Sequence, residues 1–151
     1  MTNKSKFYIK ELRARYVRRA VSGPPFLGEA VERPARVYEM FRWLTEEPRE
    51  KLLCLHLNIK YQIVSYEVVG VGSVDRFDVS PCEIFKGALL ANSPVIMLVH
   101  NHPSGSLAPS SEDCDLADTI RRLGKELRVE LLDFIIIGEG FYSFADNGRF
   151  V

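Results

Sequence analysis

The sequence of 151 residues holds three cysteines, three histidines and no net charge, since 20 Lys and Arg balance 20 Asp and Glu. Cys54, Cys82 and Cys114 stand far apart without a CxxC pair, which argues against a disulfide framework and a cysteine-based zinc site. Long apolar runs are also absent: the longest fall well short of the roughly 18 residues that a membrane span needs. The N-terminus has no signal-peptide layout, so we expect a cytoplasmic protein without membrane contact.

The composition, with 46% hydrophobic and 26% charged residues, indicates a globular domain rather than a disordered chain. Charge is unevenly distributed, because residues 1–19 carry seven basic side chains against the single acid Glu11. We therefore separate a basic N-terminal segment, residues 1–28, from a domain over residues 29–151. Such a segment can bind nucleic acid or an acidic partner, but it is more commonly a solvated or docked surface.

Hydrophobic periodicity and turn residues predict a mixed α/β domain, with a mixed central β-sheet flanked by helices. The expected helices cover residues 35–48, 81–91 and 110–127. The expected strands cover residues 52–57, 61–69, 70–79, 94–99 and 130–137, after which two glycines turn the chain back. Residues 6–17 are ambiguous between strand and helix. The uncharged run at 94–99 is typical of a strand buried on both faces.

Two of the three histidines, His100 and His102, stand at the end of that run, in the stretch VHNHPSGSLAPSSED. Because side chains alternate along a strand, both imidazoles face the same side and can share one ligand. Asp113 follows at the start of the next helix. Two imidazoles and one carboxylate, with a fourth position left for water, form the ligand set of a catalytic zinc site.

The same residues also have structural interpretations, which the spacing alone leaves open. The two histidines can be hydrogen-bonded residues at a strand end, and Asp113 can belong to a capping box that begins at Ser110. Asn101 and Ser104 are expected to shape the turn. His56 lies in an apolar strand, and we expect it to be buried and hydrogen-bonded outside the site.

The pattern His100-x-His102, seven residues, Ser110, two residues and Asp113 closely resembles the motif of the RadC branch of the JAB/MPN metalloprotease-like family. The segments LHLNIK, VSPCEIFKGAL and LLDFIIIGEGFYSFADNG also resemble that family. The resemblance implies a cytidine-deaminase-like JAB/MPN architecture and one Zn²⁺ held by His100, His102 and Asp113. It further implies hydrolysis of a peptide or isopeptide bond in a peptide or protein-conjugate substrate, with Ser110 helping to hold the oxyanion.

A hydrolase of this family also requires a glutamate base on a strand before the histidines. Glu50 stands just before LLCLHLN, where the family's glutamate opens such a strand, and we assign it as the base; Glu67 is the alternative. The base would take a proton from the zinc-activated water and pass it to the leaving amine. The chain departs from the family pattern at Ala117 and Phe134, where threonine and histidine are usual, which puts the support of the ligands in doubt.

Two other functions stay open on the sequence. A DNA-associated accessory or repair protein of a mobile element would bind phosphate through the basic side chains of residues 4–19, with a steep dependence on salt. A zinc-stabilised interaction module would hold the metal without turnover. Neither the substrate nor the oligomeric state follows from the sequence.

Overall fold

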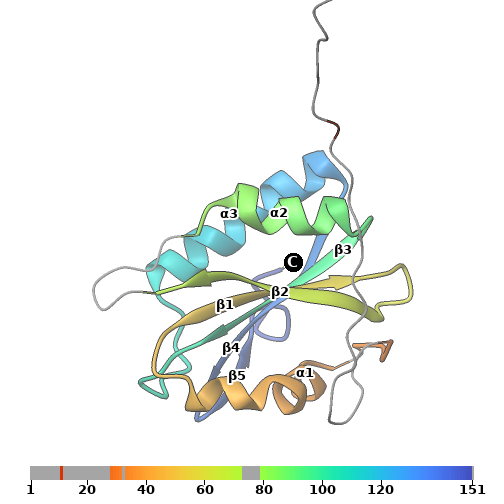
Figure 1. The fold of residues 1–151 in the computed structure, drawn as a ribbon. Helices are drawn as coiled ribbons and strands as arrows, with labels where there is room; N and C mark the ends of the chain where they lie inside the picture. Colours follow the sequence, from red (N-terminus) through yellow and green to blue (C-terminus); the bar gives the residue numbers. More distant parts are fainter. Residues whose placement is uncertain (1–10, 12–27, 32, 73–78, 151) are drawn as a thin grey trace, which may run out of the picture.

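The structure, a computed structural model, describes residue 11 and residues 28–31, 33–72 and 79–150. A five-stranded sheet lies between two layers of helices (Figure 1). Its strand order is β2–β1–β3–β4–β5, in which β3 and β4 are parallel and the other neighbours are antiparallel. The strands are β1 (Lys51–Leu57), β2 (Ile63–Val71), β3 (Val95–Asn101), β4 (Glu130–Gly138) and β5 (Gly140–Ser143).

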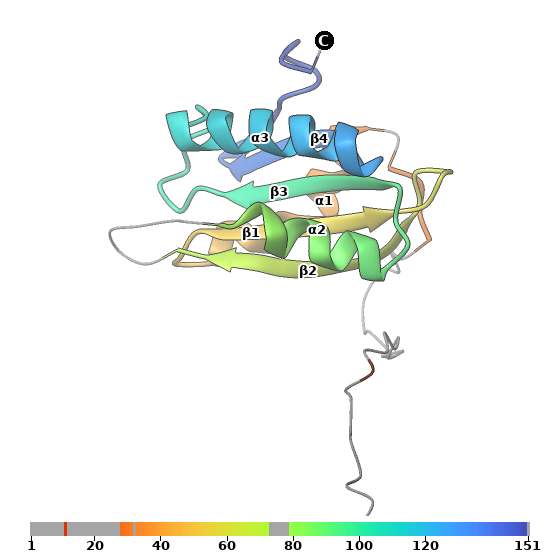
Figure 2. The same ribbon diagram turned by 90° about the horizontal axis from the view of Figure 1, so that it is seen from above.

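Helices cover both faces of this sheet (Figures 1 and 2). One face carries α1 (Pro34–Phe41), which continues as the 3₁₀ helix η1 (Arg42–Glu46). The other face carries α2 (Pro81–Leu90) and α3 (Ser111–Leu127), and α3 makes the crossover that joins the parallel strands β3 and β4. Within the described part of the chain, no helix combines the length and the apolar character that crossing a bilayer requires.

The central strand β3 separates two hydrophobic cores. All of its residues are buried, and they alternate between the faces: Ile96 and Leu98 belong to the core under α2 and α3, whereas Met97 and Val99 belong to the core under α1. This confirms the expectation of a strand without a solvent face. The alternation continues to His100, which therefore lies on the α2 and α3 side.

The sequence-based elements correspond to the observed ones, with three differences. The first helix becomes a 3₁₀ helix after Phe41, and residues 140–143 form the additional edge strand β5. Residues 70 and 71 complete β2 rather than start a new strand. The rest of the expected strand at 70–79 falls largely outside the described residues, as does the ambiguous stretch at 6–17, apart from Glu11.

The topology brings three chain segments to one edge of the sheet. Because β1 runs antiparallel to β3, the start of β1 lies beside the end of β3, and Leu52 pairs with His100. The loop after β3 then returns to begin α3 at Ser111. Residues far apart in sequence, near positions 50, 100 and 113, therefore meet at this edge.

Candidate metal centre

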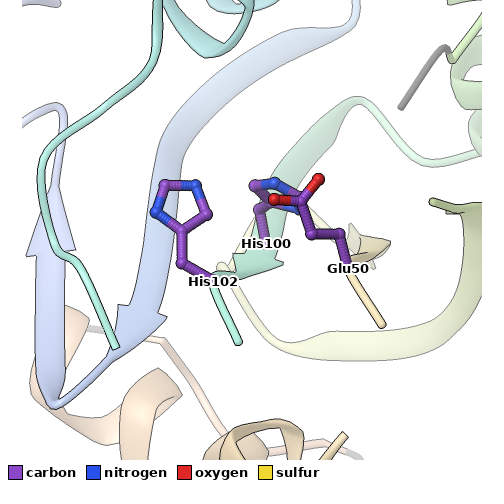
Figure 3. A group of neighbouring side chains, drawn as sticks. All are labelled: Glu50, His100 and His102. Carbon is purple, nitrogen blue, oxygen red and sulfur yellow. The ribbon is translucent and has the colours of Figure 1, made fainter. Parts of the chain in front are cut away.

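Glu50, His100 and His102 converge where these segments meet (Figure 3). One possible ligand atom from each residue lies within 4.8 Å of the others. Glu50 directly precedes β1, His100 is in β3, and His102 directly follows it. Nitrogen and carboxylate donors at this spacing could hold a divalent cation.

His100 is 2% exposed, and its ring is fixed by a hydrogen bond to the backbone. Its Nδ1 lies 2.8 Å from the carbonyl oxygen of Lys51. A carbonyl can only accept, so Nδ1 carries the proton and Nε2 is the nitrogen able to coordinate. Burial lowers the pKa of His100 in spite of the opposing charge of Asp113, which favours the neutral imidazole that metal binding requires.

His102 lies beyond the end of β3 but keeps the geometry of the strand, because its amide donates to the carbonyl of Ile137 at 2.8 Å. Its Nδ1 lies 3.0 Å from the carbonyl oxygen of Ser106, so Nε2 is again the nitrogen able to coordinate. That Nε2 is 3.3 Å from Asp113 Oδ2. The hydrogen bond with Asp113 raises the pKa of His102 against the effect of burial.

Asp113 joins both imidazoles, since its Oδ1 also lies 3.7 Å from Nε2 of His100. Ser110 holds it in place: the amide and the hydroxyl of Ser110 each donate to Asp113 Oδ2 at 2.8 Å. In return the Asp113 amide donates to Ser110 Oγ at 3.0 Å. Burial alone would raise the pKa of Asp113, but the hydrogen bonds from His102 and Ser110 outweigh it and lower that pKa to about 2.

The structural and functional interpretations of Asp113 are therefore compatible. The capping box that begins α3 at Ser110 is confirmed, and the same box turns an ionised carboxylate toward the two imidazoles. The Ser110 hydroxyl donates its hydrogen bond to Asp113. Its contact with an oxyanion stays a prediction.

Glu67, the alternative base, lies away from these residues. Its Oε1 is 3.6 Å from Nε2 of His56, under Gly87 of α2. His56 is 4% exposed and bonds to the hydroxyl of Ser65 at 2.8 Å. The expectation that His56 is buried and hydrogen-bonded outside the site is confirmed, and Glu50 is the glutamate that the fold brings to His100 and His102.

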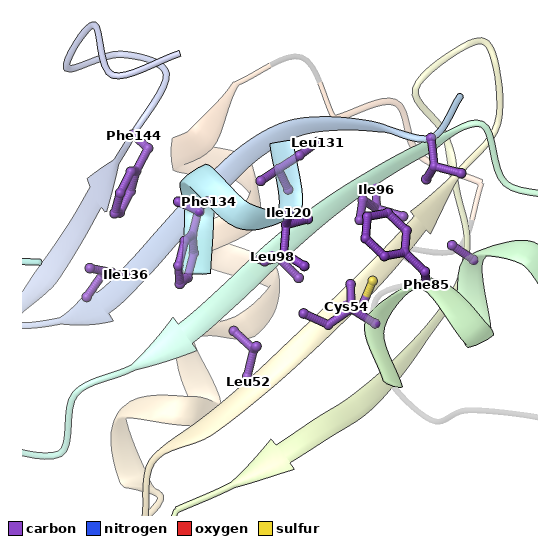
Figure 4. Close-up of a cluster of buried hydrophobic side chains, with 14 residues drawn as sticks. Leu52, Cys54, Phe85, Ile96, Leu98, Ile120, Leu131, Phe134, Ile136 and Phe144 are labelled. Atoms are coloured by element: carbon purple, nitrogen blue, oxygen red, sulfur yellow. The ribbon is translucent and has the colours of Figure 1, made fainter. Parts of the chain in front are cut away.

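The two departures from the family pattern, Phe134 and Ala117, are both buried apolar residues. The ring of Phe134 lies 6.4 Å from the imidazole of His100, between centroids. It also stacks on Phe144 at 4.9 Å (Figure 4). Ala117 is buried in the same core. Phe134 thus supplies an apolar wall to His100, while the backbone of Lys51 orients the imidazole. Outer-shell support of this kind normally sets ligand geometry.

Sequence reasoning missed the groups that orient the imidazoles, because they are carbonyls of Lys51 and Ser106. Backbone carbonyls leave no trace in residue identity. It also treated Asn101 as a turn residue, although the side chain is 1% exposed and bonds to the backbone around Glu50. An amide at the end of a fully buried strand was the available signal.

These residues fit a cation. Both Nδ1 atoms are bound to carbonyls, both Nε2 atoms face the Asp113 carboxylate, and Glu50 lies beside them. Neutral imidazoles whose second nitrogen donates to a backbone carbonyl are the usual state of metal-binding histidines. The segment 4–19, whose basic side chains were considered for DNA binding, lies outside the described residues except for the acidic Glu11.

Comparison with known proteins identifies the family of the chain. The RadC-like JAB domain family matches residues 31–149. A UPF0758 protein of Methanosarcina acetivorans is 44% identical over 117 residues, which are 76% of this chain and 51% of that protein. A UPF0758 protein of Pelodictyon phaeoclathratiforme is 39% identical over 124 residues, 81% of this chain and 56% of the relative. The chain thus spans about half the length of these curated relatives, and it belongs to the RadC-like JAB domain family.

Proposed function

We propose that the chain is a zinc-dependent hydrolase that cleaves an amide bond, with Glu50 as the general base. The observation that supports this most strongly is the convergence of Glu50, His100, His102 and Asp113 at one edge of the sheet. Each imidazole has its proton fixed on Nδ1 by a backbone carbonyl. Zinc binding would displace the proton that His102 Nε2 donates to Asp113. Two neutral imidazoles and one ionised carboxylate are then a donor set that suits zinc and leaves a position for water.

In this proposal, His100, His102 and Asp113 hold the ion. A bound zinc ion would lower the pKa of a coordinated water to about 7 and polarise the carbonyl of the substrate. Glu50 accepts the proton that this water loses and then delivers it to the leaving amine, which is the two-way role of a general base and acid. Ser110 keeps the Asp113 carboxylate ionised and oriented through two hydrogen bonds.

The substrate class follows from family membership and from this chemistry together. Hydrolysis through a polarised carbonyl and a proton-delivering glutamate suits a bond whose leaving group is an amine. We therefore propose a peptide or isopeptide bond in a peptide or protein conjugate, cleaved in the cytoplasm.

The test has a metal arm and a cleavage arm. We expect the full chain, purified without added metal, to contain about one equivalent of zinc. The zinc-loaded chain is then incubated with a peptide library and with cell extract, and new amino termini are identified by mass spectrometry. We expect Glu50→Gln to retain zinc and to lose cleavage by about 10²- to 10⁴-fold.

Glu67→Gln is the matched control, because it removes the same charge from the neighbouring strand next to His56. It should leave both zinc content and cleavage unchanged. Undiminished cleavage by Glu50→Gln would reject the assignment of the base. Zinc binding without cleavage by any variant would favour the interaction module instead.

A further inference from the structure

Asn101 lies between the two histidines in the sequence. Its side chain points at the backbone on either side of Glu50. It is 1% exposed and occupies the last position of β3. Its Oδ1 accepts from the amide of Lys51 at 2.7 Å. Its Nδ2 donates to the carbonyl of Arg49 at 3.1 Å. One amide therefore bridges the residues before and after Glu50.

This bridge extends the hydrogen bonding between β1 and β3 by one residue pair beyond the last backbone pair. The register between β1 and β3 reaches the pair Leu52 and His100 and goes no further. At the next position, the side-chain amide of Asn101 stands in for a peptide group, with one donor and one acceptor. The contacts also fix which end of the amide is which, because an N–H must meet Oδ1 and a carbonyl must meet Nδ2.

Two further bonds complete the fixation of this short segment. The amide of Gly72 donates to the carbonyl of Glu50 at 2.7 Å, and His100 Nδ1 donates to the carbonyl of Lys51 at 2.8 Å. The backbone that carries Glu50 is thus bound from β3 and from the residue that follows β2. The Asn101 bonds flank Glu50 directly, whereas the Glu50 side chain itself extends toward His100 and His102 (Figure 3).

We propose that Asn101 is a positioning residue, which holds the Glu50 carboxylate at the candidate metal centre by binding Arg49 and Lys51. It does not reach the reacting atoms itself. Asn is the residue that this place requires: Asp would set a carboxylate oxygen against the Arg49 carbonyl, and Ala would leave two backbone groups without partners. The functional consequence rests on the proposed function, but the placement of Glu50 does not.

The first experiment compares crystal structures of the full chain, as wild type, Asn101→Ala and Asn101→Asp. We expect the Glu50 carboxylate to move by about 1 Å or more, or to occupy several rotamers, relative to His100 and His102. Asn101→Asp keeps the acceptor for Lys51, so it provides a second variant if Asn101→Ala does not fold. An unmoved Glu50 carboxylate in the variant that folds would overturn the inference.

Asn58→Ala is the matched control at the opposite end of β1. The Asn58 Oδ1 accepts from the amides of Lys60 and Gln62, at 2.9 and 3.1 Å, so its loss also removes an amide clamp from the strand. Both alanine variants should lower the melting temperature. Only the Asn101 variants should displace Glu50.

The second experiment uses the cleavage assay and separates positioning from a general loss of stability. We expect Asn101→Ala to lower kcat by about tenfold or more, at a KM within about twofold of wild type, while Asn58→Ala keeps wild-type kcat. Added to Glu50→Gln, Asn101→Ala should cause no further loss, because its effect passes through Glu50. Additive losses would overturn the inference. If no variant cleaves any substrate, the proposed function fails, and the position of Glu50 in the crystal structures still decides the role of Asn101.

Discussion

The same face of the sheet carries two arrangements of buried imidazole and carboxylate, and they differ in what holds the imidazole. At the candidate metal centre, His100 and His102 each donate from Nδ1 to a backbone carbonyl and turn Nε2 toward Asp113. In the second arrangement, His56 contacts the hydroxyl of Ser65 through Nδ1 and faces Glu67 across 3.6 Å.

The carboxylates respond in opposite directions. Hydrogen bonds from His102 and Ser110 lower the pKa of Asp113 to about 2, although burial opposes them. Burial raises the pKa of Glu67, with Lys86 only partly opposing. Its Oε1 and the Nε2 of His56 are buried and make no hydrogen bond with the described residues. Hydrogen bonds thus favour the ionised form of Asp113, whereas burial disfavours the charged forms of His56 and Glu67.

The comparison shows that a buried histidine next to a carboxylate is not sufficient evidence for a metal site. A carbonyl partner fixes the proton on one nitrogen and gives the other a defined direction, whereas a hydroxyl can donate or accept and fixes neither. His100 and His102 each have a carbonyl partner and lie beside an ionised carboxylate. These two features distinguish them from His56.

The largest difference between the two arrangements should appear in metal affinity. We expect His102→Ala to weaken binding of Zn²⁺ or Co²⁺ by more than about 100-fold, which exceeds the effect of losing an outer-shell partner. His56→Ala should leave the affinity unchanged. Competition titration with a chromophoric chelator measures both. Equal losses in the two variants would mean that metal binding follows overall stability rather than the site.

The pH dependence of stability should identify the second arrangement. Burial lowers the pKa of His56 to about 4, from 6.5 in the unfolded chain. Between these values the unfolded chain binds more protons, so the free energy of unfolding falls as the pH falls through this window. The loss should reach about 3 kcal/mol near pH 4.

Denaturation of wild type and His56→Gln, over the range from about pH 7 to about pH 4, isolates this contribution. The variant has no imidazole to protonate at this position, so its stability should depend less on pH. Glu67 is present in both proteins, and its raised pKa acts in the opposite sense to that of His56. Parallel curves for the two proteins would show that His56 does not carry the effect.

Much of the candidate site was accessible from the sequence because simple periodicities place it. Strand alternation puts His100 and His102 on one side, and the helix-start signal puts Asp113 at the first turn of α3. Glu50 was assigned from the family resemblance, and its place beside the histidines comes from the antiparallel pairing of β1 with β3. Assignment of these residues as metal ligands and base stays a prediction that the experiments above address.

What the sequence could not supply depends on contacts between distant backbone groups. The carbonyl of Ser106 orients His102 whatever its side chain is, and the Asn101 amide has its partners about fifty positions earlier in the chain. The short edge strand β5 is defined by its antiparallel pairing with β4, another contact between backbone groups. Tertiary contacts of this kind decide local structure over intrinsic preference.

A glycine at the metal centre offers a smaller and more local test. A Cβ at Gly138 would lie 2.5 Å from the carbonyl oxygen of Gly105 and 3.0 Å from that of Ser106. These backbone atoms cannot move away from the added methyl group as the end of a side chain can. Gly138→Ala should therefore destabilise the fold by about 2 kcal/mol. Because the Ser106 carbonyl orients His102, metal affinity should also fall, by about tenfold. Denaturation and chelator competition measure the two effects, and unchanged affinity would mean that the loop does not orient His102.

The smallest effect is expected for the corresponding glycine of the second arrangement. A Cβ at Gly87 would lie 1.7 Å from Glu67 Oε1, but this is the end of a flexible side chain that is 37% exposed. Gly87→Ala should therefore turn the Glu67 carboxylate out to solvent, at little cost because its buried oxygen makes no hydrogen bond with the described residues. Alanine stabilises a helix interior by about 1 kcal/mol relative to glycine, so the free energy of unfolding should change by less than about 1 kcal/mol. Metal affinity should match wild type. A fall in the free energy of unfolding by more than about 2 kcal/mol would instead show that the contact of Glu67 with His56 stabilises the fold.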